Sequence, residues 1–141
     1  MVLLGYAQLQ QNKIPAAMEA LIQATRVSPE EIDGWTLLGE SQRLSGRLVD
    51  ALKTLTHART IDPTSPVAAF LLGETRRSLG HVDEALSAYQ QAVQLNARFS
   101  PAWYSMAVLL KQERRKADFE AALKTLRQLD PMLAERAESG Q

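Results

Sequence analysis

The chain has 141 residues, 45% of them hydrophobic, and its 16 basic residues balance its 16 acidic ones. A chain without net charge is not expected to bind nucleic acid or a membrane surface. The lack of cysteine excludes a disulfide framework, a thiolate metal site and a cysteine nucleophile. The first ten residues contain no basic leader and only a short apolar run, so we expect one cytoplasmic domain without a membrane anchor.

Helices are expected in pairs along the chain. The first pair begins with a helix that the start of the chain cuts short, and its second helix covers residues 14–27, where apolar residues recur at helical intervals. The second pair covers about 31–44 and 47–61. Ser28 supplies a start signal for this pair, because its hydroxyl can cap a helix and a proline and a glutamate follow it.

The third and fourth pairs begin with the same kind of signal. Each opens with a serine followed by a proline, Ser65 in the third pair and Ser100 in the fourth. In the last helix of the fourth pair, Lys116 and Glu120 replace residues that are apolar in the earlier pairs, which is typical of the polar outer face that ends a repeat array. The run after Asp130 predicts a short final helix that covers the remaining apolar surface.

The pairs repeat with a period of 34 residues, which separates Gly5, Gly39 and Gly73. The same period relates further residues: Ala17, Ala51 and Ala85; Ala24, Ala58 and Ala92; and Leu21, Leu55, Tyr89 and Leu123. Small residues let two helices approach closely where their axes cross, and a bulky side chain of the opposite helix fills the gap. A period of this length is typical of helix–turn–helix arrays.

The second unit shows the repeat most fully, with these residues in order: Trp35, Leu38, Gly39, Ala51, Leu55, Ala58 and Pro63. This order resembles that of the tetratricopeptide repeat family, and the resemblance covers almost the whole chain. It implies an all-α fold, a right-handed α-solenoid of stacked antiparallel helix pairs with about four repeats and a short C-terminal capping helix. The expected divisions are a truncated repeat over 1–31, repeats over 32–65 and 66–99, an atypical repeat over 100–133 and a cap over 134–141.

By this resemblance, the first helices of the pairs line the concave groove of the superhelix, and residues one period apart form ladders along it. The predicted partner-binding residues are Tyr6, Thr36, Glu40, Arg43, Phe70, Glu74, Arg77, Tyr104 and Lys111. Two interpretations of their charges stay open. In one, each arginine pairs with the glutamate three residues before it on its own helix. In the other, Arg43, Arg77 and Lys111 bind carboxylates of a partner peptide, and the aromatic side chains anchor its apolar residues.

No motif for catalysis is found in the sequence. The two histidines, His57 and His81, share no motif, and neither a nucleophile elbow nor a phosphate-binding glycine loop is present. We therefore expect no enzymatic activity, no cofactor and no metal. The favoured function is a non-catalytic module that binds a protein or peptide in the groove.

Two alternative functions remain open. In the first, the chain forms a homodimer through its apolar N-terminal helix, with Val2, Leu3, Leu4 and Leu9 at the contact. In the second, the chain is a regulatory segment of a larger enzyme or of a secretion component. The sequence names neither the partner nor the pathway, because arrays of this kind share their scaffold residues and differ in the groove.

Overall fold

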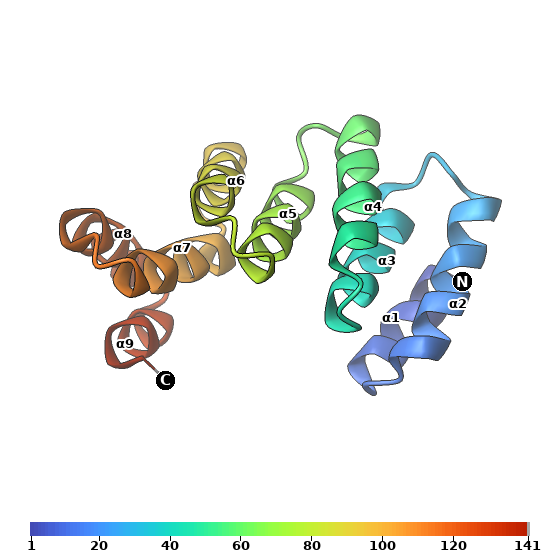
Figure 1. Ribbon diagram of the computed structural model, residues 1–141, viewed down its shortest axis with the longest axis horizontal. Coiled ribbons are helices and arrows are strands. Elements are labelled where there is room, and N and C mark those ends of the chain that lie inside the picture. Colours follow the sequence, from blue (N-terminus) through green and yellow to red (C-terminus); the bar gives the residue numbers. More distant parts are fainter. Residues whose placement is uncertain (141) are drawn as a thin grey trace.

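The structure is a computed structural model that describes residues 1–140. It is built from helices that follow one another in antiparallel pairs (Figure 1). The pairs are α1 (Val2–Gln10) with α2 (Ile14–Val27), α3 (Ile32–Leu44) with α4 (Leu48–Ile61), α5 (Pro66–Ser78) with α6 (Val82–Leu95), and α7 (Ser100–Gln112) with α8 (Lys116–Leu129). A shorter helix, α9 (Pro131–Ser139), follows them. The predicted all-α solenoid with a short final helix is confirmed.

The stack curves because its two sides are not packed alike. The backbones of α1, α3, α5, α7 and α9 approach one another in succession, and we call these the inner helices. The backbones of the outer helices, α2, α4, α6 and α8, do not approach one another anywhere in residues 1–140. The array therefore bends around the inner helices, which line its concave face, while the outer helices spread apart on the convex face (Figure 1).

Each of the first three pairs is held by one close crossing of a glycine and a bulky side chain. A Cβ atom added to Gly39 on α3 would lie 2.5 Å from Cγ of Leu55 on α4, so only glycine leaves room for this side chain. The same approach recurs one period away on each side, between Gly5 and Leu21 and between Gly73 and Tyr89. Leu21, Leu55 and Tyr89 are fully buried, so the repeating small and large residues form the core.

One of the three predicted serine caps is confirmed. Ser65 accepts a hydrogen bond through Oγ from the backbone N–H of Ala68, at 3.2 Å, at the start of α5. The predictions for Ser28 and Ser100 are wrong. The N-cap of α3 is Glu31, and Ser100 is the first residue of α7 itself, so neither serine precedes its helix as a cap. Both helices begin without a side-chain cap.

A tryptophan fixes the loop in the two places where the serine does not cap. Trp35 donates its indole N–H to the carbonyl of Pro29 at 2.9 Å, and Trp103 donates in the same way to the carbonyl of Ala97 at 2.9 Å. The equivalent residue of α5 is Ala69, which has no side-chain donor. The loops before α3, α5 and α7 are thus tied either by an indole or by a serine.

The C-terminal end of the array follows the sequence prediction. Lys116 and Glu120 on α8 are exposed, and α9 packs on α7 and α8. Asp130 caps α9 by accepting a hydrogen bond from the backbone N–H of Leu133 at 3.1 Å. Ala134, in the middle of α9, is buried against the last pair. The final helix therefore covers the end of the core and continues the row of inner helices.

Candidate functional site

The predicted ladder residues lie on the inner helices, but two of them serve mainly in packing. Thr36 is only 7% exposed, and its hydroxyl donates to the backbone carbonyl of Asp33 at 3.1 Å. Phe70 is half-buried, with its ring centroid 5.6 Å from that of Phe99 and 6.0 Å from that of Tyr89. Thr36 is therefore buried within the fold, and Phe70 contributes more to ring packing than to an open surface.

The first predicted cation, Arg43, is already paired within its own helix. Its Nε and Nη2 each donate to the carboxylate of Glu40, both at 2.8 Å. The hydrogen bond to Glu40 raises the pKa of Arg43, and the nearby Glu74 and Tyr89 act in the same direction, while burial acts against them. Because both groups of this bidentate pair are more than three-quarters buried, it is a fixed part of the groove wall.

The second predicted cation, Arg77, faces a carboxylate that a buried phenol also holds. Tyr89 on α6 donates its hydroxyl hydrogen to Oε1 of Glu74 on α5, and Nη1 of Arg77 lies 3.9 Å from the same oxygen. Burial of Tyr89, together with the charge of Glu74, raises the pKa of this phenol. Two glutamates and two arginines thus neutralise one another in the middle of the groove, as the first interpretation of the sequence held.

The third predicted cation, Lys111, has different surroundings. The residue three before it is Val108, so this helix offers no carboxylate at that place. Its Nζ donates instead to the backbone carbonyl of Glu138 on α9, and lies 6.0 Å from the centroid of the Phe119 ring. The guanidinium of Arg136 on α9 lies 5.7 Å from the centroid of the Tyr104 ring. Two cations and one aromatic ring therefore meet where α7 faces α9.

These residues surround a cavity of about 370 Å³ at the C-terminal end of the groove. Its wall is formed by Tyr104, Val108, Lys111, Gln112, Arg136, Ala137 and Gly140. Neither Lys111 nor Arg136 forms an ion pair with a carboxylate of residues 1–140, and the carboxylate of Glu138 is held by Arg127 at 3.0 Å. Within residues 1–140, Lys111 and Arg136 therefore place two positive charges beside an apolar wall at this end of the groove. We call it the α7–α9 site.

Arg136 is not among the residues predicted from the sequence. The residue lies outside the 34-residue register, because α9 begins three residues before the next inner helix is due. Tyr104 and Lys111 were predicted from the register, and both lie at this cavity. The signal that could have found Arg136 is the predicted final helix itself, since a helix that follows the last pair takes the position of an inner helix and places its side chains at the groove.

The N-terminal helix carries the residues predicted for self-association. Leu3 and Leu4 are exposed, whereas Val2 and Leu9 are half-buried. Leu4 is 51% exposed, but the residues one and two periods on, Leu38 and Leu72, are only 5% and 4% exposed. Those two side chains are covered by the preceding helix pair. The apolar face of α1 therefore resembles the faces through which α3 and α5 pack on the preceding helix pair.

Two other kinds of site have no counterpart in residues 1–140. No group of three or more histidine, aspartate or glutamate side chains is placed to hold a metal ion in this part of the chain. None of the described helices combines the length and the apolar character needed to cross a membrane.

The comparison with known families is consistent with this architecture. The family model described as tetratricopeptide repeat matches residues 2–66 and 70–132, which is most of the chain. That model describes a structural repeat and names no reaction. Among curated proteins no sequence matches the chain.

Solved structures share the fold at low sequence identity. A thermophilic TPR protein from Thermus thermophilus is 22% identical, with a TM-score of 0.87 over 98% of this chain and 78% of that one. MamA is 20% identical, with a TM-score of 0.80 over 94% of this chain and 79% of that one. A mutant O-GlcNAc transferase of Thermobaculum terrenum is 20% identical, with a TM-score of 0.72 over 75% of this chain and 20% of that one. At these identities the likeness concerns the fold alone.

Proposed function

This chain belongs to the tetratricopeptide repeat family, and we propose that it is a non-catalytic module that binds a partner polypeptide along its concave face. The partner enters the groove formed by the inner helices. Binding is centred on the α7–α9 site, and the proposed partner carries an acidic side chain next to an apolar one.

The observation that carries this proposal is the charge of the α7–α9 site. Lys111 and Arg136 lie at one cavity, and neither is ion-paired with a carboxylate of residues 1–140. A partner carboxylate would exchange the neutral carbonyl that Lys111 now contacts for a charge-assisted bond, which is roughly twice as strong. Val108 and the ring of Tyr104 offer apolar contact beside it. Arginine and tyrosine are also the residue types enriched in binding hot spots.

The middle of the groove has a different role in this proposal. Arg43 and Arg77 are held by Glu40 and Glu74, so a partner carboxylate would have to displace an existing carboxylate to reach either arginine. These residues shape the groove and offer hydrogen-bonding groups, whereas net attraction for an acidic partner comes from the α7–α9 site. Reversing a charge in the middle would also disturb the packing around Tyr89, which makes it a poor test of binding.

The test is affinity capture from an extract of the cells that make the chain. The parent chain is compared with the double variant Lys111→Glu and Arg136→Glu, and retained proteins are identified by mass spectrometry. The matched control reverses two exposed lysines on outer helices, Lys53→Glu and Lys124→Glu, so that the total charge change is equal. Circular dichroism shows whether each variant is folded.

We expect that the parent and the control retain the same partner and that the α7–α9 variant binds it at least about tenfold more weakly. The loss of a charge-assisted contact of about 1.5 to 3 kcal/mol has this effect on affinity or a larger one. If all three folded chains retain the same proteins equally, the α7–α9 site is not the binding site. If only the control loses the partner, binding lies on the convex face and the groove proposal is wrong.

Self-association through α1 is a second candidate, favoured by the exposure of Leu3 and Leu4. A copy of the chain that covers this face would bury side chains that the other repeats keep buried. Sedimentation at rising concentration tests the idea, with Leu3→Glu as the variant. A dimer that the variant abolishes would support it. A parent chain that remains monomeric at the highest concentration would remove it.

A further inference from the structure

The spread of the outer helices leaves a gap between each neighbouring pair of them, and side chains must fill it because protein interiors are closely packed. One position of the later outer helix can be compared across the three gaps. The residues at this position are His57 on α4, Gln91 on α6 and Thr125 on α8, each one period from the next. They differ in size and chemistry, so the three gaps are not closed alike.

In the first two gaps, the residue at this repeat position contacts a side chain of a neighbouring helix. Beside the first gap, the imidazole of His57 on α4 meets the indole of Trp35 on α3 edge to face, with ring centroids 4.4 Å apart and planes at 73°. Between α4 and α6, Arg59 donates through Nη1 to Oε1 of Gln91 at 2.7 Å, which bridges the two outer helices. The first gap therefore has an aromatic ring beside its tryptophan, and the second has a hydrogen bond between its two outer helices.

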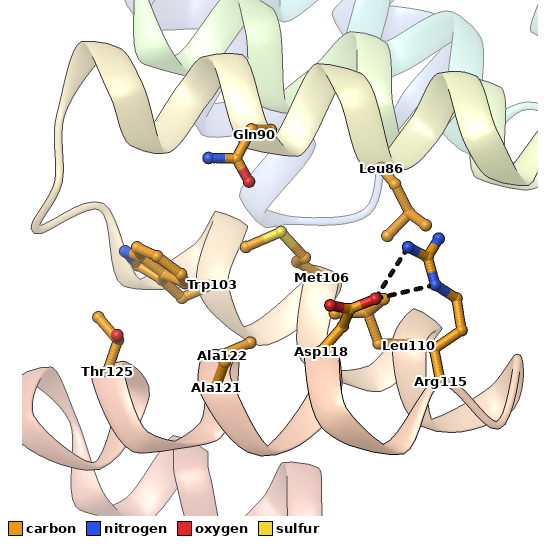
Figure 2. A pocket seen from close by; sticks show the side chains of 10 residues that line it. All are labelled: Leu86, Gln90, Trp103, Met106, Leu110, Arg115, Asp118, Ala121, Ala122 and Thr125. Atoms are coloured by element: carbon orange, nitrogen blue, oxygen red, sulfur yellow. Dashed lines mark hydrogen bonds and ion pairs between the residues drawn. The ribbon is translucent and has the colours of Figure 1, made fainter.

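The third gap, between α6 and α8, is open. A cavity of about 380 Å³ lies there. Figure 2 shows Trp103 and Thr125 at one end of it and the ion pair of Arg115 with Asp118 at the other. Leu86 on α6 and Met106 on α7 line it between these ends. A cavity of this size with a mainly apolar wall and a few polar groups is typical of a ligand site.

The first and third gaps are otherwise built alike, because they are two periods apart. Both tryptophans donate the indole N–H to a backbone carbonyl at 2.9 Å. Arg47 pairs with Asp50 at 2.9 Å beside the first gap, as Arg115 pairs with Asp118 at 2.9 Å beside the third. At the ring position, however, the first gap has His57 and the third has Thr125, which has no ring.

We propose that the cavity beside Trp103 is a second binding site, on the convex face, which takes an uncharged aromatic side chain of a partner polypeptide. The chain itself shows what fits there, since the equivalent place beside Trp35 holds an aromatic ring in edge-to-face contact. The two charged residues of the wall, Arg115 and Asp118, neutralise each other, which suits an uncharged occupant. The first gap has a groove of about 490 Å³ along α2, but neither Trp35 nor His57 lines it. An aromatic side chain bound in that groove would therefore not contact a tryptophan.

The experiment follows the two indole N–H resonances of the ¹⁵N-labelled chain by NMR, assigned with the Trp35→Phe variant. The probe is a blocked peptide of sequence Gly-Ser-Phe-Ser-Gly, and its control has alanine in place of phenylalanine. We expect the phenylalanine peptide to shift the Trp103 resonance to saturation and to leave that of Trp35 in place. The alanine peptide should bind at least about tenfold more weakly, because it lacks the apolar ring.

The decisive variant is Thr125→His, which installs the ring that the first gap already contains. It should weaken binding of the phenylalanine peptide by about tenfold or more, whereas the matched control Lys124→His, at an exposed neighbouring position, should bind like the parent. If Thr125→His does not fold, Ala121→Lys gives the same test. Ala121 lines the cavity, and the equivalent residue two periods earlier is Lys53, whose longer side chain would narrow the cavity.

Three results would overturn the proposal. The first is an equal response to the phenylalanine and alanine peptides, or none at millimolar concentration. The second is unchanged binding by both Thr125→His and Ala121→Lys. The third is a Trp103 resonance that shifts with the concentration of the chain alone, which would show that a second copy occupies the cavity.

Discussion

Two glycines of α3 have opposite surroundings, and exchanging each for alanine should have opposite effects. At Gly39 the new Cβ would lie 2.5 and 2.6 Å from Cγ and Cδ2 of Leu55, which is fully buried and has no room to move. At Gly34 the nearest atom, Cγ2 of Thr25, would be 3.4 Å away, an ordinary contact. Both changes gain helix propensity of up to about 1 kcal/mol, but only Gly39→Ala adds overpacking, which costs about 1 to 3 kcal/mol.

We therefore predict that Gly34→Ala equals or exceeds the parent in stability, and that Gly39→Ala is less stable than Gly34→Ala by about 1 to 3 kcal/mol. Urea unfolding followed by circular dichroism measures both. Leu55→Ala serves as the control background, because removing the leucine side chain removes the overlap, and Gly39→Ala should then cost nothing further. If Gly39→Ala were as stable as Gly34→Ala, the close crossing of α3 and α4 would not hold the pair as described.

Three further changes test other contacts. Tyr89→Phe removes the hydrogen bond to Glu74 and should cost about 1 to 3 kcal/mol. Because burial raises the pKa of Tyr89 above 10.0, the parent should lose stability above pH 10, where only the unfolded phenol releases its proton. The urea midpoints of the variant should lack this part of the decline. Hydrogen bonds from the Thr64 hydroxyl and backbone N–H lower the pKa of Asp62, so the ionised carboxylate stabilises the parent and this contribution is lost only as pH falls below the ordinary 3.8. Thr64→Val removes the hydroxyl and should raise the pKa of Asp62, which NMR titration of the carboxyl group in both chains measures. Asp130→Ala removes the cap of α9 and should cost about 0.5 to 2 kcal/mol by thermal unfolding.

The repeat made most of the fold predictable from sequence. The crossing of two helices requires a small residue, so the spacing of Gly39 and Gly73 gives the register of the pairs. That register places Leu55 and Tyr89 opposite the glycines, and both are fully buried. Helix starts were less predictable. Ser28 and Ser65 both precede a proline, yet only Ser65 caps, because an indole hydrogen bond takes over the loop wherever a tryptophan follows.

The functional surfaces were only partly predictable, because they depend on differences between repeats. The spacing of Glu40 and Arg43 predicted their ion pair, but it could not decide between pairing and partner binding until the geometry was known. Arg136 was missed because it lies outside the register. The cavity beside Trp103 was also missed, although comparing Thr125 with His57, two periods earlier, would have pointed to it.

The central claim is that a partner polypeptide lies in the groove at the α7–α9 site. A photoreactive amino acid placed at Val108, which lines that site, tests it directly in the cells that make the chain. The control has the same amino acid at Val49, which is exposed on an outer helix. We expect a covalent adduct with a different polypeptide from position 108 and none from position 49. Adducts from position 49 alone, or adducts of the chain only with itself, would contradict it.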